Sequence, residues 1–398
     1  MITVLLDKAE FEYDIHSLVK AFYPKEEVYV STKDKEKKEE PVHYHMDVQF
    51  APEEIIFFWK KVEPSEENEN QTGITKRVAV DYTNRKETKN SLKRTLYRLL
   101  SEYTGVELPW GNLTGIRPTK IPMALLEEGK SEEEIAHYMK ETYFTSDEKI
   151  KLSIEIAERE LQLLKKLDYE EGYSLYIGIP FCPTTCLYCS FTSYSLAAWK
   201  NRMDEYLDAL EKELDYTAVK FAHKKLNSIY IGGGTPTTLN PQQLDRLIRK
   251  IKCSFDLSHL VEFTVEAGRP DSITKEKLMV LRNHDISRIS INPQTMKQET
   301  LDLIGRHHTV QQTIDSFNLA RELGFDNINM DLIVGLPGES LSDVADTMEV
   351  IRKLAPDNLT VHSLAIKRAA RLNIQRERYQ DFEIVNTCLL YTSDAADD

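Results

Sequence analysis

Six short runs of β-branched and aromatic residues alternate with segments of helical period over the second half of the chain. The strand-like runs are residues 174–179, 227–232, 261–267, 286–292, 327–334 and 358–364. Helices are predicted over 200–220, 241–252, 274–284, 310–323 and 341–354. Strands that alternate with helices imply right-handed crossovers and a parallel sheet. The pattern therefore predicts an α/β fold whose sheet is either curved into a partial barrel or doubly wound.

The first part of the chain alternates strands and helices less regularly. Strands are predicted over 1–6, 27–31, 54–60 and 76–82, and helices over 10–22, 91–103, 123–129, 133–139 and 147–167. Two charged or polar stretches, 32–41 and 64–73, lack apolar periodicity and are predicted to be loops.

Three segments follow from these patterns. We expect residues 1–171 to form an added N-terminal α+β domain and residues 172–386 to form the main domain. Residues 387–398 lose the helical period and resemble a translated transposon adapter from a DNA library, so we expect them to be a non-native tail.

Charge and composition narrow the class of protein. The formal net charge of −14 argues against a protein that mainly binds nucleic acid. No apolar run approaches the roughly 20 residues that a membrane helix needs, and the N-terminus carries acidic residues where a signal peptide would be basic. We therefore expect a cytoplasmic protein without a membrane span.

Residues 181–190 read FCPTTCLYCS and hold three of the five cysteines. Cys182, Cys186 and Cys189 follow the first strand of the main domain, at the edge of the sheet where α/β folds place their functional loops. In a reducing cytoplasm such a cluster indicates a metal or catalytic site. Cys253 stands alone and is predicted to be a buried helix residue, and Cys388 lies in the expected tail.

Two kinds of metal site agree with soft thiolate ligands. A structural zinc ion takes four ligands, usually in two pairs, and no second Cys or His pair follows at a suitable spacing. A [4Fe–4S] cube that is held by three cysteines keeps one iron open for another ligand, and the residues favour this interpretation. The run GGGTPT from Gly232 lacks the Lys-Ser/Thr pair of a phosphate loop. It allows a ligand to approach the backbone, or forms a tight strand-to-helix turn.

The motifs together resemble a known family. The run YIGIPFCPTTCLYC and the GGGTPT segment are similar to the radical S-adenosylmethionine (SAM) superfamily. The later motifs INPQT, IGRHHT, MDLIVGLPGES and VHSLAIKRA resemble its branch of oxygen-independent coproporphyrinogen III dehydrogenases, over residues 174–371. The segment GNLTGIRPTK and the N-terminal region resemble the HemZ type, with a C-terminal domain of the relatives missing. The resemblance implies a partial (β/α)6 barrel.

The resemblance also implies site residues. Three cysteines would bind the cluster, and SAM would bind its fourth iron and a set of side chains at the strand ends. The metal ligands would be Cys182, Cys186 and Cys189, and the SAM contacts Tyr176, Tyr188, Gly233, Gly234, Thr235, Glu266, Gln294, Arg306, Asp331, Ile333 and Ala365. For Ile333 and Ala365, ordinary packing in the barrel is an equal alternative. His307 and His308 are neighbours whose side chains diverge, so they are not expected to share a metal.

The implied reaction is an oxidative decarboxylation. A 5′-deoxyadenosyl radical takes a hydrogen from a propionate of coproporphyrinogen III, CO2 leaves, one electron passes to an acceptor, and a vinyl group forms. Two such reactions give protoporphyrinogen IX. The implied partners are this substrate, one or two molecules of SAM, and a low-potential electron donor of the flavodoxin or ferredoxin type. The substrate's carboxylates suggest a cationic rim, for which the candidates are Arg117, Lys120, Lys367, Arg368 and Arg371.

One departure from the family supports an alternative function. Well-known dehydrogenases of this branch carry a further cysteine two positions after the third ligand, where this chain has Phe191. Haem chaperones of the same branch also lack that cysteine, so a haem-binding chaperone is the alternative. A binding module that is stabilised by zinc is a third interpretation.

Overall fold

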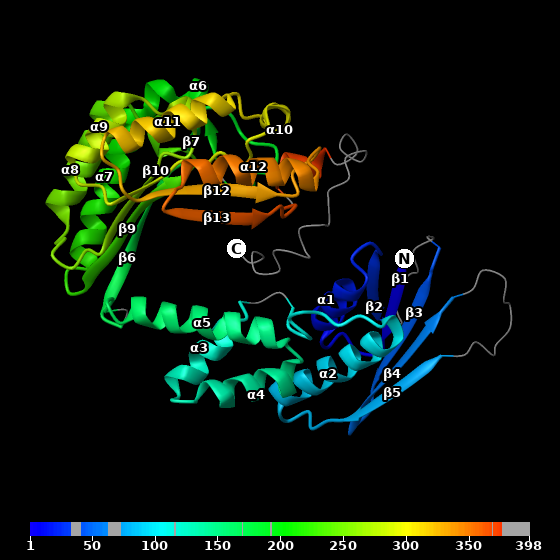
Figure 1. Ribbon diagram of the computed structural model, residues 1–398. Coiled ribbons are helices and arrows are strands. Elements are labelled where there is room, and N and C mark those ends of the chain that lie inside the picture. Colours follow the sequence, from blue (N-terminus) through cyan, green and yellow to red (C-terminus); the bar gives the residue numbers. More distant parts are fainter. Residues whose placement is uncertain are drawn as a thin grey trace. The chain divides into compact units, whose positions relative to one another are not determined.

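The structure is a computed structural model, and it describes residues 1–32, 41–62, 73–114, 117–168, 170–191, 193–367 and 369–375 (Figure 1). The chain divides into two compact units, of which the first is Met1–Gln162 and the second begins at Leu163. The main domain was proposed to begin at residue 172, which is the first residue of strand β6 (Gly172–Ile179). Most of the two predicted loops, residues 33–40 and 63–72, and the predicted tail at 387–398 lie outside the described residues.

The first unit contains a five-stranded mixed sheet in the order β2-β1-β3-β4-β5. The strands are β1 (Ile2–Leu6), β2 (Val28–Thr32), β3 (Tyr44–Phe50), β4 (Glu54–Lys61) and β5 (Ile74–Ala79). Strand β1 runs parallel to β2 and β3, whereas β3, β4 and β5 are antiparallel. Helices α1 (Glu12–Phe22) and α2 (Arg85–Thr104) contribute side chains to the same core as the sheet. This unit therefore has the α+β character that was predicted for it.

Strand β3 was missing from the predictions. Its sequence YHMDVQF alternates between buried and exposed positions, so Met46, Val48 and Phe50 are buried while the polar residues between them point away from the core. Only three apolar residues therefore carry the strand signal. The pairing of β3 with both β1 and β4 explains why so weakly patterned a segment forms a strand.

Three helices complete the first unit. They are α3 (Lys120–Glu127), α4 (Glu132–Tyr143) and α5 (Asp147–Leu164). Ile135 and Met139 of α4 pack against Ile150 and Ile154 of α5 in a small core of their own. A capping box between Ser131 and Glu134 begins α4, since each side chain bonds the other residue's backbone N–H.

The second unit is built on a six-stranded sheet in the order β13-β12-β11-β10-β9-β6, with every neighbouring pair parallel. After β6, its strands are β9 (Lys225–Gly233), β10 (Glu262–Glu266), β11 (Arg288–Ser290), β12 (Ile328–Val334) and β13 (Asn358–Ser363). Because consecutive strands are neighbours and crossovers are right-handed, the connecting helices lie on one face of the sheet. All six predicted strands are confirmed, and the arrangement is the predicted open, partial barrel, with β6 and β13 at its edges.

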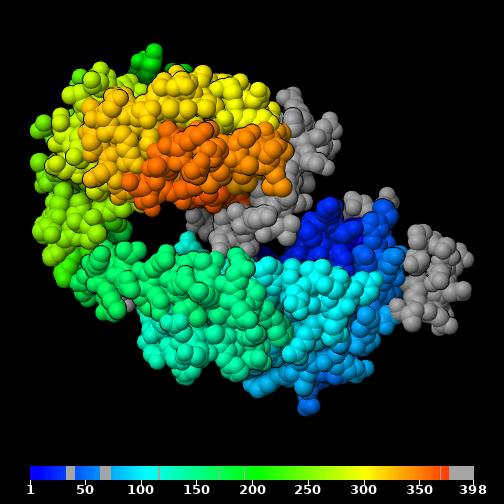
Figure 2. Space-filling view, in the orientation of Figure 1, coloured from blue at the N-terminus to red at the C-terminus, as the bar shows by residue number. Residues whose placement is uncertain are grey.

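Five long helices cover that face (Figure 1). They are α7 (Met203–Lys220), α8 (Pro241–Ser254), α9 (Lys275–Asn283), α11 (Val310–Glu322) and α12 (Leu341–Leu354). Capping boxes begin α8, α11 and α12. Shorter helices are α6 (Leu196–Trp199), α10 (Gln298–Leu303) and α13 (Arg371–Ile374), with single 3₁₀ turns at Lys200–Arg202, Pro236–Thr238 and Pro270–Ser272. Figure 2 shows the later part of the second unit, in yellow and orange, as one continuous surface.

The two faces of the six-stranded sheet differ in chemistry. Ile229 and Ile231 of β9 belong to the main core with the helices. Side chains alternate along a strand, so Tyr230 between them points to the opposite face, in register with Tyr176 of β6. On the neighbouring strands, Glu266 is in register with Ser290, and Asp331 is in register with Thr360. The face without helices is therefore rich in polar side chains.

No helix among the described residues is long and apolar enough to cross a membrane.

The packing of α7 gives a test of this core. Leu207 is fully buried among the helices and the sheet, whereas Val219 on the same helix is 80% exposed. We expect Leu207→Ala to lower the free energy of unfolding of the second unit by about 2–5 kcal/mol, because it leaves a cavity. Val219→Ala is the control and should change it by less than about 0.5 kcal/mol. Equal effects of the two variants in chemical denaturation would contradict this assignment of the buried face.

Candidate functional site

The polar face of the sheet carries a compact group of side chains near the carboxyl ends of the strands. The Tyr230 hydroxyl donates a hydrogen bond of 2.5 Å to Glu266 Oε1. The ring of Tyr176 stacks on that of Tyr230, with 5.8 Å between centroids and 11° between planes. Tyr176 is 61% exposed, so it covers Tyr230 from the solvent side. These three side chains therefore come from three adjacent strands, β6, β9 and β10.

Glu266 sits in an environment that opposes its charge. Burial, with a further contribution from nearby Asp331, raises the pKa of Glu266 to about 7, although the hydrogen bond from Tyr230 and the charge of Arg306 act in the opposite direction. A carboxyl group whose pKa lies near neutrality both donates and accepts hydrogen bonds. It suits a ligand with hydroxyl groups.

The glycines after β9 are required by close backbone and ring contacts. A Cβ atom on Gly232 would lie 2.6 Å from the Tyr230 ring. Gly233 has a φ of +102°, and a Cβ on Gly234 would lie 2.7 Å from the carbonyl oxygen of Phe181. The turn that follows ends at Thr235, which is 1% exposed and whose Oγ1 donates to Cys182 Sγ at 3.5 Å. The glycine run therefore packs the end of β9 directly against the cysteine loop.

The cysteine loop follows β6 and the two-residue strand β7 (Phe181–Cys182), which pairs with β8 (Tyr194–Ser195). It is anchored by segments that lie far along the chain. Thr184 Oγ1 donates to the Gly305 carbonyl at 2.7 Å, and the Leu187 N–H donates to the Ile304 carbonyl at 2.9 Å. The Leu187 carbonyl accepts from the Leu372 N–H, also at 2.9 Å. These hydrogen bonds fix the loop against two distant segments of the chain.

Arg306 is buried between the cysteine loop and the strand ends. It is 6% exposed, and its Nη1 donates to the Asn292 carbonyl at 2.5 Å and to the Gly268 carbonyl at 3.4 Å. Its Nε has no hydrogen-bond partner within the described residues. Tyr188 and Cys186 both lie close to this guanidinium. Tyr188 is half-buried, and burial of its hydroxyl raises its pKa. Arg306 therefore offers a buried positive charge with one free donor to an anionic group.

Arg269 was missed by the sequence analysis, although it is also buried here. It is 3% exposed, and its Nη1 donates to the carbonyl and to the Oγ1 of Thr184, both at 3.0 Å. The same Nη1 lies 4.0 Å from Cys186 Sγ. The signal that was available is weak, since it consists of one basic residue between Gly268 and Pro270 directly after the third strand.

Gln294 and Asp331 are joined through the backbone. The Gln294 N–H donates to the Asp331 carbonyl at 2.9 Å, and Asp331 Oδ1 accepts from Asn329 Nδ2 at 2.7 Å. Gln294 has a φ of +70° and is 7% exposed, so a non-glycine residue holds a strained conformation inside the site. Such strain persists only where the surroundings enforce it.

The remaining predicted residues lie at the margin of this group. Ile333 packs with Leu187 and Tyr188 in a small apolar cluster, and Ala365 is exposed beyond the end of β13. The prediction of a buried Cys253 is wrong, because the final turn of α8 presents it to solvent.

The two neighbouring histidines differ in exposure. His307 is exposed and His308 is fully buried, so their side chains diverge as expected. Burial lowers the pKa of His308 to about 4, which keeps its imidazole neutral.

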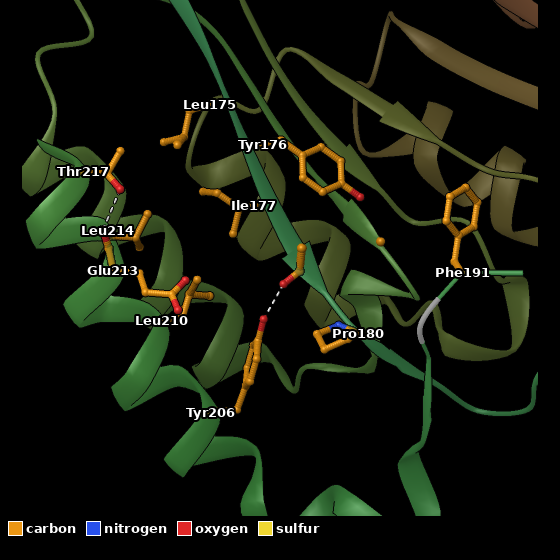
Figure 3. Close-up of a pocket in the computed structure, with 12 residues that line it drawn as sticks. Leu175, Tyr176, Ile177, Pro180, Phe191, Tyr206, Leu210, Glu213, Leu214 and Thr217 are labelled. Carbon is orange, nitrogen blue, oxygen red and sulfur yellow. Dashed lines mark hydrogen bonds between the residues drawn. The ribbon is translucent and has the colours of Figure 1, made fainter. Parts of the chain in front are cut away.

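A cavity of about 430 Å³ opens beside the edge strand β6 (Figure 3). Leu175, Ile177, Leu210 and Leu214 make one side of it apolar, and the Tyr206 hydroxyl below donates to the Gly178 carbonyl at 2.5 Å. Its other lining residues include Tyr176, Gly233 and the exposed Phe191. Leu175 and Ile177 pack in the core with the helices, so the cavity lies mainly on the helix side of β6, and it shares Tyr176 with the polar group around Tyr230.

The donor set of the cysteine loop fits an iron–sulfur cluster. Cys189 interacts electrostatically with both Cys186 and Cys182, so the three sulfurs face one region. Burial raises the pKa of the Cys182 and Cys189 thiols, while Arg269 and Arg306 favour the thiolate of Cys182. Within the described ranges, no three His, Cys, Asp or Glu side chains are close enough to hold one metal ion. In a cube, by contrast, each thiolate binds a different iron.

Comparison with known proteins assigns this unit to a family. Residues 176–351 match the family model of the Radical SAM superfamily. The chain is 43% identical over 320 residues to the oxygen-independent coproporphyrinogen-III oxidase-like protein HemZ of Bacillus subtilis, a match that covers 78% of this chain and 64% of HemZ.

Two further relatives match over about half of the chain. The heme chaperone HemW of Bacillus subtilis is 41% identical over 198 residues, which cover 49% of this chain and 51% of HemW. The oxygen-independent coproporphyrinogen III oxidase of Escherichia coli is 34% identical over 196 residues, which cover 49% of this chain and 42% of the oxidase. The chain spans less than two thirds of the length of each of these relatives.

The close approach at Gly234 can be tested directly. In Gly234→Ala, the new methyl group meets backbone atoms of Ile179 and Phe181 within 3.0 Å, so the end of β6 must move. We expect a loss of about 1–3 kcal/mol in the free energy of unfolding and faster reaction of Cys182 with a thiol reagent. The matched control is Gly178→Ala, whose Cβ meets only the Tyr176 ring at 3.6 Å. A Gly234 variant that behaves like this control would argue against a tight contact.

The raised pKa of Glu266 predicts a dependence of stability on pH. The folded-state pKa of about 7 lies above the ordinary value of 4.5, so the protonated form stabilises the fold. This contribution is complete below pH 4.5, and it is lost as the pH rises to 7. In Glu266→Gln, the melting temperature relative to wild type should therefore rise by several degrees between pH 5 and pH 8. The control is Glu322→Gln at an exposed position of α11. A difference in melting temperature between Glu266→Gln and wild type that does not change with pH would refute the raised pKa of Glu266.

Proposed function

The second unit of this chain is a radical SAM domain, and we propose that the protein uses it to decarboxylate two propionates of coproporphyrinogen III, giving protoporphyrinogen IX. The observation that carries this proposal is the cysteine loop, which is fixed against the carboxyl ends of the strands beside Glu266 and Arg306. The name of the HemZ relative, which matches both units of the chain, supports the choice of substrate.

The residues that would hold the cofactors lie in the cysteine loop, in the polar group and at the margin of that group. Cys182, Cys186 and Cys189 would each bind one iron of a [4Fe–4S] cluster. The residues proposed for SAM are Tyr176, Tyr188, Gly233, Gly234, Thr235, Glu266, Gln294, Arg306, Asp331, Ile333 and Ala365. When bound together and reduced by one electron from the external donor, the cluster and SAM would supply a 5′-deoxyadenosyl radical that can abstract a hydrogen atom from a propionate.

The side chains of this unit would then bind and orient. The free Nε of Arg306 is suited to the carboxylate of SAM, because a charge-assisted hydrogen bond replaces an unmet buried donor. Glu266, held by Tyr230, is suited to the hydroxyl groups of a ribose. The exposed rings of Tyr176 and Phe191 line the cavity beside β6 and would pack against the macrocycle of the substrate.

The proposed cationic rim is only partly supported. Arg371 Nη2 donates to the Thr185 carbonyl, so this guanidinium helps to hold the cysteine loop. Lys367 is exposed and remains a candidate for a substrate carboxylate. Arg368 lies outside the described residues, and Arg117 and Lys120 belong to the first unit. The low-potential electron donor and the binding of one or two molecules of SAM are part of the proposal.

Haem binding without turnover is the second candidate function. It is favoured by the match to HemW and by Phe191, which is 76% exposed at the position where the better-known dehydrogenases carry a cysteine. A chaperone of this kind would use the open edge of the sheet to bind a finished porphyrin. The two candidates therefore differ in the product that is formed.

Anaerobic reconstitution with iron and sulfide, followed by dithionite, SAM and coproporphyrinogen III, distinguishes them. We expect 5′-deoxyadenosine and protoporphyrinogen IX to form together, and both to be lost in Cys186→Ala because one iron ligand is gone. Cys253→Ala, at an exposed position of α8, is the control and should keep both products. Tight haem binding with neither product would support the chaperone, and stoichiometric zinc after anaerobic purification would support neither.

A further inference from the structure

Arg269 forms a hydrogen-bond network that joins the segment after β10 to the cysteine loop. Its Nε and Nη2 donate to the two carboxylate oxygens of Asp271 at 3.0 and 2.7 Å, which is a bidentate ion pair. Its Nη1 reaches the carbonyl and the Oγ1 of Thr184, and Thr184 Oγ1 in turn donates to the Gly305 carbonyl. The guanidinium therefore joins two segments of the chain directly and a third, at Gly305, through Thr184.

The burial of the Arg269–Asp271 ion pair is electrostatically costly. The Arg269 side chain is 3% exposed, and that of Asp271 is 22% exposed. A buried ion pair gains little over a well-packed apolar pair, because both ions lose their hydration. The same Nη1 lies 4.0 Å from Cys186 Sγ, and Arg269 also interacts with Cys182. The positive end of the pair is thus directed at the thiolates.

We propose that Arg269 is a positioning residue that orients Cys186 and places a fixed positive charge beside the cluster, which makes one-electron reduction easier, and that Asp271 moderates this charge. The proposal rests on the function proposed above. Reduction adds one electron, and so one negative charge, to the cluster, and the electron comes from the low-potential donor. A neighbouring cation favours the reduced state, and charges and hydrogen bonds around the ligands are known determinants of cluster potentials.

The test measures the midpoint potential of the cluster in the reconstituted full chain, by anaerobic titration with dithionite followed by electron paramagnetic resonance. We expect Arg269→Gln to make reduction at least tenfold less favourable, a shift of about 59 mV to lower potential for one electron. Arg269→Lys keeps the charge and should restore most of the potential. Asp271→Asn removes the compensating carboxylate and should shift the potential to higher values.

Shifts of the midpoint potential in opposite directions in Arg269→Gln and Asp271→Asn distinguish this role from simple anchoring of the loop. Loss of anchoring would lower the iron content of both variants, but it would not shift the two potentials in opposite directions. Arg249→Gln is the control, since Arg249 forms an exposed pair with Asp245 on α8, outside the site. A potential within error of wild type in Arg269→Gln, or shifts of the same sign in both variants, would overturn the proposal. If Arg269→Gln does not retain iron, the sign of the Asp271→Asn shift decides alone.

The wild-type protein distinguishes this failure from that of the proposed function. Wild type without four irons and four sulfides per chain would refute cluster binding itself. Wild type with a cluster whose potential ignores Arg269 and Asp271 would refute only the inference about these two residues.

Discussion

Right-handed crossovers between parallel strands that follow one another in order are the constraint on which the second unit depends. They place the long helices on one face of the sheet and bring the carboxyl ends of all six strands to one edge. The helix face is buried by Ile and Leu side chains, so the other face is left for polar groups. The cysteine loop, the glycine turn and Glu266 meet because each follows or ends a strand of this series.

The site concentrates groups that a folded protein normally avoids burying. Two guanidinium groups, a carboxyl group with a raised pKa and a non-glycine residue with positive φ all lie within it. Each opposes folding, and the extensive apolar core beneath offsets the cost. Arg306 shows how the cost is limited, since backbone carbonyls from two loops accept its hydrogen bonds. A ligand with a negative charge would offset the remaining free-energy cost of burying these positive charges.

Periodicity predicted the second unit well because each strand there carries several apolar residues and each long helix has a clear buried face. It failed at β3, where Asp47 and Gln49 interrupt the apolar run. It also failed at Cys253, because only the packing of α8 decides which face of that helix is buried. Motif spacing indicated the three cysteines and the glycine turn. Arg269 was not predictable, because its contact with Thr184 joins residues 85 positions apart and depends on the tertiary fold.

The anchoring of the cysteine loop has a consequence for how the protein matures. The loop lies near the start of the second unit, yet its hydrogen bonds join residues that are far apart in the sequence. Thr184 bonds Gly305, 121 residues later, and Thr185 bonds Arg371, 186 residues later. Contacts of such long range form late in folding. A growing chain that has just exposed its three thiols therefore lacks the scaffold that orients them. Loading of the proposed cluster would therefore follow synthesis and closure of the whole sheet, and the three thiols would need protection from oxidation until then.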